Sequence, residues 1–382
     1  MNVLLIGGSC SLIDNLILKI RKEGHRVFLL TGDKYKQSKY QKVFERYDFP
    51  YDCEELREIL ESVNPDVTIF MGAFDTNYRW NNEERESVKY TSNLINILVA
   101  YSEVRRGKFI MLSSHEVYSG NHTHDIEETE PTLGSGFKGA TLAQAEEICA
   151  NFHKNWNLDI VVLRLDHVYS IPKELKDVNN ICARMCIQSL KDGCIKADSK
   201  NEFSLLPERD AVEFIFQVVK INQHSQFIYH LSSGRVISEV ELAGMIEKYL
   251  QNGSSIVTVD ESGGRCVLSG KKFEEEYGIH VFGKLEENVE KMAAYMKKHA
   301  SVFVDERELS LPWWKRMLNQ WMWLVKAIIP FIENLICFIP FFMLNNRTVG
   351  SQYFANLDPY LLYVLLFAIV YGQQQATFSA IL

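Results

Sequence analysis

The stretch Leu4-Leu-Ile-Gly-Gly-Ser-Cys-Ser-Leu-Ile13 passes from a short apolar run, through two glycines, into a helical pattern. The run Val3 to Ile6 is uniformly apolar, which is typical of a strand buried on both faces. From Ile13 to Lys22 the apolar residues recur at helical spacing. A strand, a tight turn and a helix at the start of the chain predict an α/β fold whose first turn lies at the edge of a sheet.

The same alternation of apolar strands and helices continues along the chain. Such strands indicate a parallel sheet with helices on both faces, so we predict a doubly wound α/β fold. Ligands of this class of fold bind at the carboxyl ends of the strands. The expected strands are 26–30, 67–71, 108–112 and 160–165, and the expected helices are 54–62, 83–101, 142–156 and 285–298.

The composition excludes several classes of protein. Of the 382 residues, 47% are hydrophobic and 24% are charged, which is incompatible with a wholly disordered or collagen-like chain. A formal net charge of −8 provides no basic field for a nucleic-acid partner. The eight cysteines show no paired spacing, and Cys182, Cys186 and Cys194 lack a histidine at ligand spacing. We therefore expect reduced thiols and no metal site.

The C-terminal part has a different composition. No Lys or Arg occurs between Thr348 and Leu382. The apolar segments 327–344 and 359–382 are long enough to cross a bilayer. We predict an amphipathic linker at 301–318 and membrane helices at 319–382. The alternatives are a helix lying on the membrane surface for the first segment and a buried helix of a globular domain for the second.

The flanking residues predict the orientation of this part. Trp313-Trp-Lys-Arg316 pairs aromatic and cationic side chains, as interfacial anchors do, and its cations place the N-terminal side in the cytoplasm. The chain opens without a basic, signal-like segment. We therefore expect a membrane protein with a cytoplasmic N-terminal domain. Its apolar pattern is still running at Leu382, which predicts further spans beyond it.

Six landmarks occur in order along residues 1–298. Together they resemble extended short-chain dehydrogenases, the NAD-dependent epimerase/dehydratase family. The resemblance implies a Rossmann-like domain at 1–300 with a small C-terminal lid at about 171–281. The landmarks are Leu4 to Ile13, Pro65-Asp-Val-Thr-Ile-Phe-Met-Gly-Ala73, Phe109-Ile-Met-Leu-Ser-Ser-His-Glu-Val-Tyr-Ser-Gly120, Val161-Val-Leu-Arg-Leu-Asp-His-Val-Tyr-Ser-Ile-Pro172, Arg209-Asp-Ala-Val-Glu-Phe-Ile215 and Tyr229-His-Leu-Ser-Ser-Gly-Arg-Val-Ile-Ser238.

The cofactor-binding turn departs from the family pattern. The family has three glycines, which permit the turn, the approach of the pyrophosphate and the packing of helix on strand. Here only Gly7 is kept, and Cys10 and Ile13 replace the other two. Thr31 stands where an acid should hold the ribose, although Asp33 is near. NAD or NADP thus stays open as a cofactor. The resemblance maps its contacts onto Gly7, Gly8, Cys10, Leu12, Thr31, Gly72 and Ala73.

The catalytic residues depart from the pattern as well. The family uses a Tyr as acid and base, a Lys four residues later and a Ser that orients the substrate. Ser114 matches the family's Ser, but the Tyr and Lys positions map onto Lys138 and Leu142, or onto Phe137 and Thr141 after a shift by one. An aliphatic or phenyl group cannot exchange a proton. Ser114 and Lys138 are the remaining candidates for catalysis.

Other polar groups lie near the expected site. Asp75, Arg79 and Trp80 follow the 67–71 strand, where a ligand or a surface loop is expected. His115, His122 and His124 flank the expected mouth and are interpreted as solvated loop residues. Glu127, Glu128 and Glu130 are interpreted as a solvated acidic face.

Three functions are consistent with these residues. The first is a catalytically inactive, membrane-anchored binding or assembly module, which retains a nucleotide or nucleotide-sugar, acts beside membrane-bound assembly proteins and dimerises through helices 83–101 and 142–156. The second is an active NAD(P)-dependent nucleotide-sugar epimerase, dehydratase or reductase that uses Lys138 beside Ser114. The third is a non-enzymatic ligand sensor.

A second resemblance suggests a cellular context. The segment Asp358-Pro-Tyr-Leu-Leu-Tyr-Val-Leu-Leu-Phe-Ala-Ile-Val-Tyr-Gly372 resembles the first spans of the membrane-bound cyclic-di-GMP receptor of Pel exopolysaccharide synthesis. Gram-positive forms of that receptor carry an epimerase-like domain in front. The resemblance implies a role in bacterial exopolysaccharide synthesis, with the cyclic-di-GMP-binding domains beyond Leu382.

Overall fold

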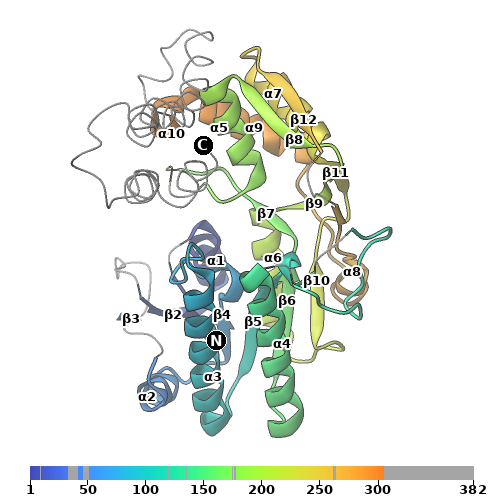
Figure 1. Ribbon diagram of the computed structural model, residues 1–382. Helices are drawn as coiled ribbons and strands as arrows, with labels where there is room; N and C mark the ends of the chain where they lie inside the picture. Colours follow the sequence, from blue (N-terminus) through green and yellow to red (C-terminus); the bar gives the residue numbers. More distant parts are fainter. Residues whose placement is uncertain are drawn as a thin grey trace, which may run out of the picture. The chain divides into compact units, whose positions relative to one another are not determined.

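A computed structural model describes the N-terminal part of the chain (Figure 1). The described residues are 1–8, 10–32, 42–45, 51–118, 121–134, 136–173, 175, 178–260 and 264–304. The predicted membrane segment 319–382 and all but the first four residues of the predicted linker lie outside them. Among the described helices, none combines the length and the apolar character that crossing a membrane requires.

The centre of the structure is a seven-stranded sheet in which every neighbouring pair is parallel. The strand order is β10-β6-β5-β4-β1-β2-β3, so the order reverses between β1 and β4. The predicted doubly wound parallel sheet is therefore confirmed. The strands are β1 (Asn2–Ile6), β2 (Arg26–Thr31), β3 (Lys42–Glu45), β4 (Val67–Phe70), β5 (Lys108–Ser114), β6 (Ile160–Leu165) and β10 (Ile228–Leu231).

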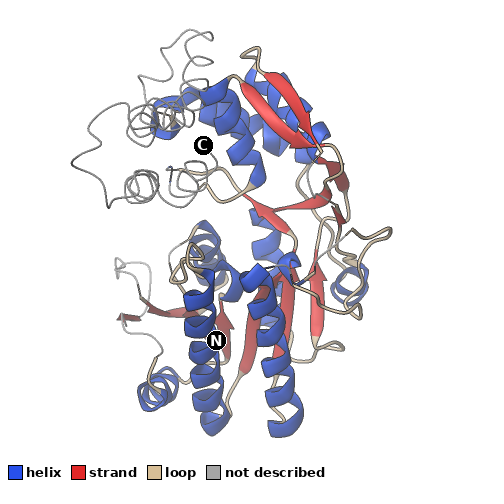
Figure 2. Cartoon of the chain, in the orientation of Figure 1, coloured by secondary structure: helices blue, strands red, loops and turns tan. Residues whose placement is uncertain are grey.

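Helices cover both faces of this sheet, as Figure 2 shows. Two apolar clusters separate the faces, because alternate side chains of each strand point to opposite sides. On one face α1 (Ser11–Lys22) packs with α6 (Glu208–Lys220), and α8 (Lys271–Tyr277) contributes Phe273 to the same cluster. On the other face lie α2 (Cys53–Val63), α3 (Glu83–Val104) and α4 (Gly136–Trp156).

A second, smaller group of strands and helices alternates along the chain with the last elements of the main sheet layer. It contains the strands β7 (His167–Tyr169), β9 (Glu202–Pro207), β11 (Val236–Ser238) and β13 (Arg265–Cys266), and the pair β8 (Cys194–Asp198) and β12 (Ser255–Val259). Its helices are α5 (Ile181–Asp192), α7 (Glu239–Leu250) and α9 (Leu285–Lys298), which contact one another. The chain ends its described part with α10 (Ala300–Phe303). Within the predicted lid range 171–281, α6 and β10 belong to the main sheet layer.

Short helical turns follow two central strands at their carboxyl ends. They are η2 (Gly72–Phe74) after β4 and η3 (His115–Val117) after β5. Gly72 has a φ of +50°, and a Cβ there would lie 2.0 Å from the Leu112 carbonyl oxygen. Only glycine allows this close approach between the two segments. The two turns therefore meet at one edge of the sheet, which is where the candidate site lies.

Candidate functional site

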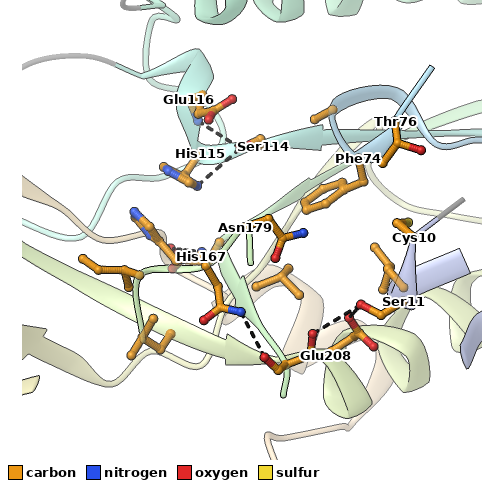
Figure 3. Close-up of a pocket in the computed structure, with 18 of the residues that line it drawn as sticks. Cys10, Ser11, Phe74, Thr76, Ser114, His115, Glu116, His167, Asn179 and Glu208 are labelled. Carbon is orange, nitrogen blue, oxygen red and sulfur yellow. Dashed lines mark hydrogen bonds and ion pairs between the residues drawn. The ribbon is translucent and has the colours of Figure 1, made fainter. Parts of the chain in front are cut away.

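A pocket of about 450 Å³ opens at the carboxyl ends of the central strands (Figure 3). The main sheet layer lines it with the β1–α1 turn, the segments after β4, β5 and β6, and the first turn of α4, while α5 and β9 line it from the second group. Figure 3 shows Cys10, Ser11 and Glu208 at one end, which we call the turn end. Ser114, His115 and His167 lie at the other, which we call the imidazole end.

At the turn end a carboxylate binds the backbone of the predicted cofactor loop. The amide of Gly8 donates a 2.7 Å hydrogen bond to Asp75 Oδ1, and the amide of Asn77 donates to the same oxygen at 2.9 Å. Asp75 is only 5% exposed. The loop amide is thus already bonded to a buried anion from the segment after β4. The sequence predicts a ligand or a surface loop at Asp75. In the structure Asp75 lines the pocket and accepts a hydrogen bond from the predicted cofactor loop.

A second carboxylate lies at the start of α1. Glu208 accepts hydrogen bonds from Ser11 Oγ and Asn15 Nδ2, both at 2.5 Å. Cys10 precedes the helix, and burial, with further contributions from Glu208 and Asp75, raises the pKa of its thiol to about 12. The Cys10 side chain is therefore a neutral thiol between two carboxylates. Ile13 is fully buried in the core beneath.

These residues do not fit the diphosphate of a dinucleotide. A helix N-terminus normally attracts phosphate because its amide groups are unpaired and its dipole is positive. Here the carboxylate of Asp75 accepts from the Gly8 amide, and that of Glu208 accepts from the Ser11 and Asn15 side chains at the start of α1. Over the whole pocket, four carboxylates stand against two cations, Lys138 and Arg184. Thr31, at the end of β2, is fully buried and supplies no carboxylate for a ribose, and Asp33 lies outside the described residues.

Only some of the positions to which the family resemblance assigns cofactor contacts line the pocket. Cys10, Leu12 and Ala73 line the pocket, whereas Gly7, Gly8, Thr31 and Gly72 do not.

The two candidate catalytic residues do line the pocket together. Ser114 is 5% exposed, and its Oγ accepts from the Glu116 amide at 3.3 Å, capping η3. The Nζ of Lys138 lies 2.7 Å from Glu116 Oε2, and the two side chains form an ion pair. Gly139 makes this pair possible, because a Cβ there would lie 2.4 Å from the Glu116 carbonyl oxygen.

The mapped position of the family's Lys is buried in the core. Leu142 has no exposed surface. In the shifted register, Phe137 is 51% exposed, and the Thr141 hydroxyl donates to Ser87 Oγ and to the Phe137 carbonyl. Neither register therefore supplies a tyrosine and lysine to the pocket.

Three polar residues form the imidazole end. The rings of His115 and His167 stack with centroids 3.6 Å apart. Asp166, which is 1% exposed, accepts from His167 Nδ1 at 2.9 Å and from the His167 amide at 2.8 Å. The hydroxyls of Ser204 and Ser232 donate to its other oxygen. The side-chain ligand atoms of His115, Asp166 and His167 all lie within 4.8 Å of one another.

The electrostatics of the imidazole end follow from its burial. Burial and the neighbouring His167 hold the pKa of His115 well below its ordinary value. Burial alone would raise the pKa of Asp166, but the hydrogen bond and charge of His167, with smaller contributions from His115 and Ser204, lower it overall. A deprotonated carboxylate therefore lies directly behind the two imidazoles.

The sequence profile of the family described as "NAD dependent epimerase/dehydratase family" matches residues 3–229, which is more than half of the chain. The chain belongs to this family. Among curated relatives, human dTDP-D-glucose 4,6-dehydratase is 23% identical over 167 residues, which are 42% of this chain and 45% of that protein. The chain thus matches less than half of this relative's length.

Solved structures of the epimerase/dehydratase family share the fold. The dTDP-glucose 4,6-dehydratase of Bacillus anthracis, solved with NAD, superposes with a TM-score of 0.66 and 15% identity, covering 79% of this chain and 98% of that chain. The UDP-glucose 4-epimerase of Thermotoga maritima, solved with UDP-glucose, gives a TM-score of 0.66 and 16% identity, covering 78% and 100%. At these identities the likeness establishes the fold alone.

A buried network supports the pocket of this epimerase-family domain from below. Arg164 donates Nε bonds of 3.0 Å to both oxygens of Glu146 and an Nη2 bond of 2.5 Å, and both side chains are almost fully buried. Tyr118 accepts from Arg164 and lies 2.9 Å from His230 Nε2. The network joins β5, α4, β6 and β10 under the imidazole end.

One acidic residue that the sequence analysis assigns to a solvated face is buried in the structure. Glu128 is 9% exposed instead of solvated. Its carboxylate accepts from the His230 amide at 3.1 Å and pairs with Lys272 at 3.1 Å. The prediction of a fully solvated acidic face is therefore wrong at this position. The partners that bury it come from segments more than 100 residues away in the chain.

The loop histidines also differ from the expectation. His115 is only partly exposed, lines the pocket and stacks on His167, so it is not the freely solvated loop residue that the sequence indicated. His122 and His124 contact Glu130 at 3.7 and 3.0 Å and do not line the pocket. Of the residues after β4, Trp80 lines the pocket, whereas Arg79 does not.

The sequence interpretation missed Asp166 and His167 as site residues, although both lie in a recognised landmark. The signal was available, because they directly follow a strand expected to end at the site.

Proposed function

We propose that this domain is a catalytically inactive member of the epimerase/dehydratase family that serves as a binding or assembly module. The observation that carries the proposal is the hydrogen bond from the Gly8 amide to Asp75. It places a buried carboxylate on the loop where family members carry a dinucleotide's diphosphate. With Glu208 beside it, the turn end carries two negative charges, so a diphosphate would meet repulsion there instead of unpaired amides.

The catalytic positions support the same proposal. The position of the family's acid–base tyrosine is taken by Lys138, whose Nζ is engaged by the Glu116 carboxylate at 2.7 Å. Leu142 is buried apolar surface and offers no polar group to a ribose. A hydride-transfer mechanism of the family type therefore lacks both its acid–base group and its cofactor anchor.

An active enzyme is the second candidate, because Ser114 and Lys138 do line one pocket. It predicts that turnover of a nucleotide-sugar with NAD or NADP depends on Lys138. A Lys138→Ala variant that keeps full turnover would exclude this mechanism. A wild-type chain without turnover would leave the binding module.

The setting of the module is also a proposal. The apolar segment 319–382 would anchor it to a membrane, with the epimerase-family domain on the cytoplasmic side and other membrane-bound assembly proteins as partners. A place in bacterial exopolysaccharide synthesis follows from the resemblance of the tail, and a dimer through α3 and α4 follows from the resemblance to the family. Membrane fractionation and protease accessibility of the full chain test the anchor and its orientation.

The direct test is a cofactor titration of the purified full chain. NADH and NADPH are titrated to millimolar concentration while nicotinamide fluorescence is followed, and the supernatant of the denatured protein is assayed for carried-over nucleotide. We expect no saturable binding of NADH or NADPH and no carried-over dinucleotide. A family dehydratase handled in parallel is the positive control, and a cooperative melting transition shows that the chain is folded. Saturable binding or a co-purified dinucleotide would contradict the proposal.

A further inference from the structure

We propose that the imidazole end of the pocket binds a divalent transition-metal ion of the Zn²⁺ class, with His115 and His167 as ligands and Asp166 as the residue that positions His167. This inference goes beyond the proposed function and holds whether or not a dinucleotide binds. It rests on the geometry of three side chains from the ends of two neighbouring strands.

The first observation is the proximity of the donor atoms. All lie within 4.8 Å of one another. Zn–N bonds of about 2.0–2.1 Å at a tetrahedral angle place two donors roughly 3.4 Å apart, so the donor atoms must approach by up to about 1.4 Å to close the site. The rings stack at 3.6 Å, so a turn of the His115 ring about its side-chain bonds is needed to aim both nitrogens at one ion. His115 Nδ1 lies 3.3 Å from Ser114 Oγ, a contact that a metal bond can replace, and the His115 ring also hydrogen-bonds to the backbone of Leu165.

The second observation is the support behind His167. Its Nδ1 lies within hydrogen-bond distance of Asp166 Oδ1, at 2.9 Å. That contact leaves Nε2, on the far side of the ring from Asp166, as the nitrogen for the ion. Phe203 packs against the His167 ring with centroids 4.9 Å apart. A carboxylate that orients a ligating histidine in this way is a recurring feature of metal sites.

Asp166 itself is suited to positioning and not to coordination. Its two oxygens already accept from the His167 ring and amide, from Ser204 and from Ser232. A carboxylate has about four acceptor positions, so all are in use. The ion would then have two protein ligands and open positions that face the pocket. An oxygen atom of solvent or of a bound ligand would complete its coordination.

The third observation is the charge of the surroundings. The pocket lining holds four carboxylates and two cations. One of those cations, Lys138, is paired with Glu116. The same excess of negative charge that opposes a diphosphate at the turn end favours a cation inside the pocket. Imidazole donors suit Zn²⁺, Cu²⁺, Ni²⁺ and Co²⁺ and select against Mg²⁺ and Ca²⁺.

The test is metal binding by the full chain without a polyhistidine tag. The chain is stripped with a chelator and titrated with Zn²⁺ by calorimetry, and with Co²⁺ while its visible absorption is followed. We expect one saturable site for each ion and none for Mg²⁺. His115→Gln and His167→Gln should each weaken binding at least 100-fold. Asp166→Asn should weaken it about 10- to 100-fold, as loss of an orienting carboxylate does.

Controls separate this site from others on the chain. His122→Gln changes a histidine outside the pocket and should bind like wild type. The visible Co²⁺ spectrum should show nitrogen ligation and disappear in the two pocket variants, which excludes thiol sites. Circular dichroism confirms the fold of each variant. If Asp166→Asn does not fold, His115→Gln and His167→Gln still test the proposed metal site. Absence of a saturable site, or binding unchanged in both His115→Gln and His167→Gln, would overturn the proposal.

Discussion

The turn end and the imidazole end of the pocket lie on the same edge of one sheet, yet their chemistry differs. At the turn end, Asp75 and Glu208 bind backbone and side-chain donors of the β1–α1 segment. At the imidazole end, a single carboxylate, Asp166, lies behind two histidines that face the cavity. In the first case the carboxylates use up the donors of an anion site. In the second the carboxylate orients donors that a cation can use.

Under the proposals above, the fold keeps its scaffold while its ligand chemistry differs between the two ends. The strands beneath both ends are buried. The difference lies in which side chains reach the strand ends. On this account, a few substitutions at such positions alter the sign of the charge that the pocket accepts.

The largest expected effect lies in the network under the imidazole end. Arg164→Met leaves the Glu146 carboxylate buried without its bidentate partner, which should lower the free energy of unfolding by about 3–5 kcal/mol. Urea denaturation measures the loss. Glu146→Leu combined with Arg164→Met should recover most of it, because no buried charge is left.

The matched control is an exposed pair. Arg57 and Glu54 lie 2.5 Å apart with side chains 41% and 70% exposed, so Arg57→Met should cost less than about 1 kcal/mol. Equal losses for Arg57→Met and Arg164→Met would refute the view that the buried network supports the imidazole end.

The second effect is a pH dependence of stability from His230. Burial lowers the pKa of His230 to about 3; the Glu128 carboxylate opposes this shift and Arg164 adds to it. The Tyr118 hydroxyl lies within hydrogen-bond distance of His230 Nε2. The unfolded chain binds a proton near pH 6.5, but the folded chain does not. Stability is therefore lost as pH falls from about 6.5 towards 3, by up to about 1.4 kcal/mol per pH unit.

Denaturation of wild type and His230→Gln between pH 7 and pH 4 measures this contribution. The free energy of unfolding of the variant should change less with pH than that of wild type, by up to about 1.4 kcal/mol per pH unit. His280→Gln, a change at a side chain that is 73% exposed, should leave the slope unaltered. Parallel curves for wild type and His230→Gln would show that His230 does not carry the effect.

The smallest expected effect sharpens the comparison at the turn end. Asp75→Asn combined with Glu208→Gln removes two charges and keeps amide oxygens that can accept from Gly8 and Ser11. Affinity for inorganic pyrophosphate should rise about tenfold, because each removed charge relieves roughly 1 kcal/mol or less of screened repulsion. Calorimetry at low salt measures it.

The control variant removes two negative charges from a surface outside the pocket. Glu58 and Glu61 are exposed on α2, and Glu58→Gln with Glu61→Gln should leave pyrophosphate affinity unchanged. A rise of equal size in both double variants would mean that net charge, and not the turn end, sets the affinity.

The sequence predicted the sheet well because its signal is local. The runs around Leu5, Ile69 and Ile110 are largely apolar, and each is a central strand. The helix predicted from Leu142 begins six residues earlier, at Gly136. Its first turn depends on Gly139 packing against Glu116, which no local pattern reports.

The sequence indicated part of the pocket lining and missed other parts. Ser114, at the end of β5, and Lys138, in α4, line the pocket together, yet the bond between Gly8 and Asp75 joins residues 67 positions apart. His115 and His167 meet because β5 and β6 are neighbours with Ser114 opposite Leu165. Strand order could have indicated that pair, whereas the ring stacking and the burial of Asp166 required the structure.

Native mass spectrometry of the full chain, as purified from the producing cells, tests the central claim most directly, because one spectrum reports both kinds of ligand. The reversal of charge preference predicts a chain that carries a transition-metal ion and no dinucleotide, and a His167→Gln chain that carries neither. A wild-type chain that retains a dinucleotide and no metal would contradict it.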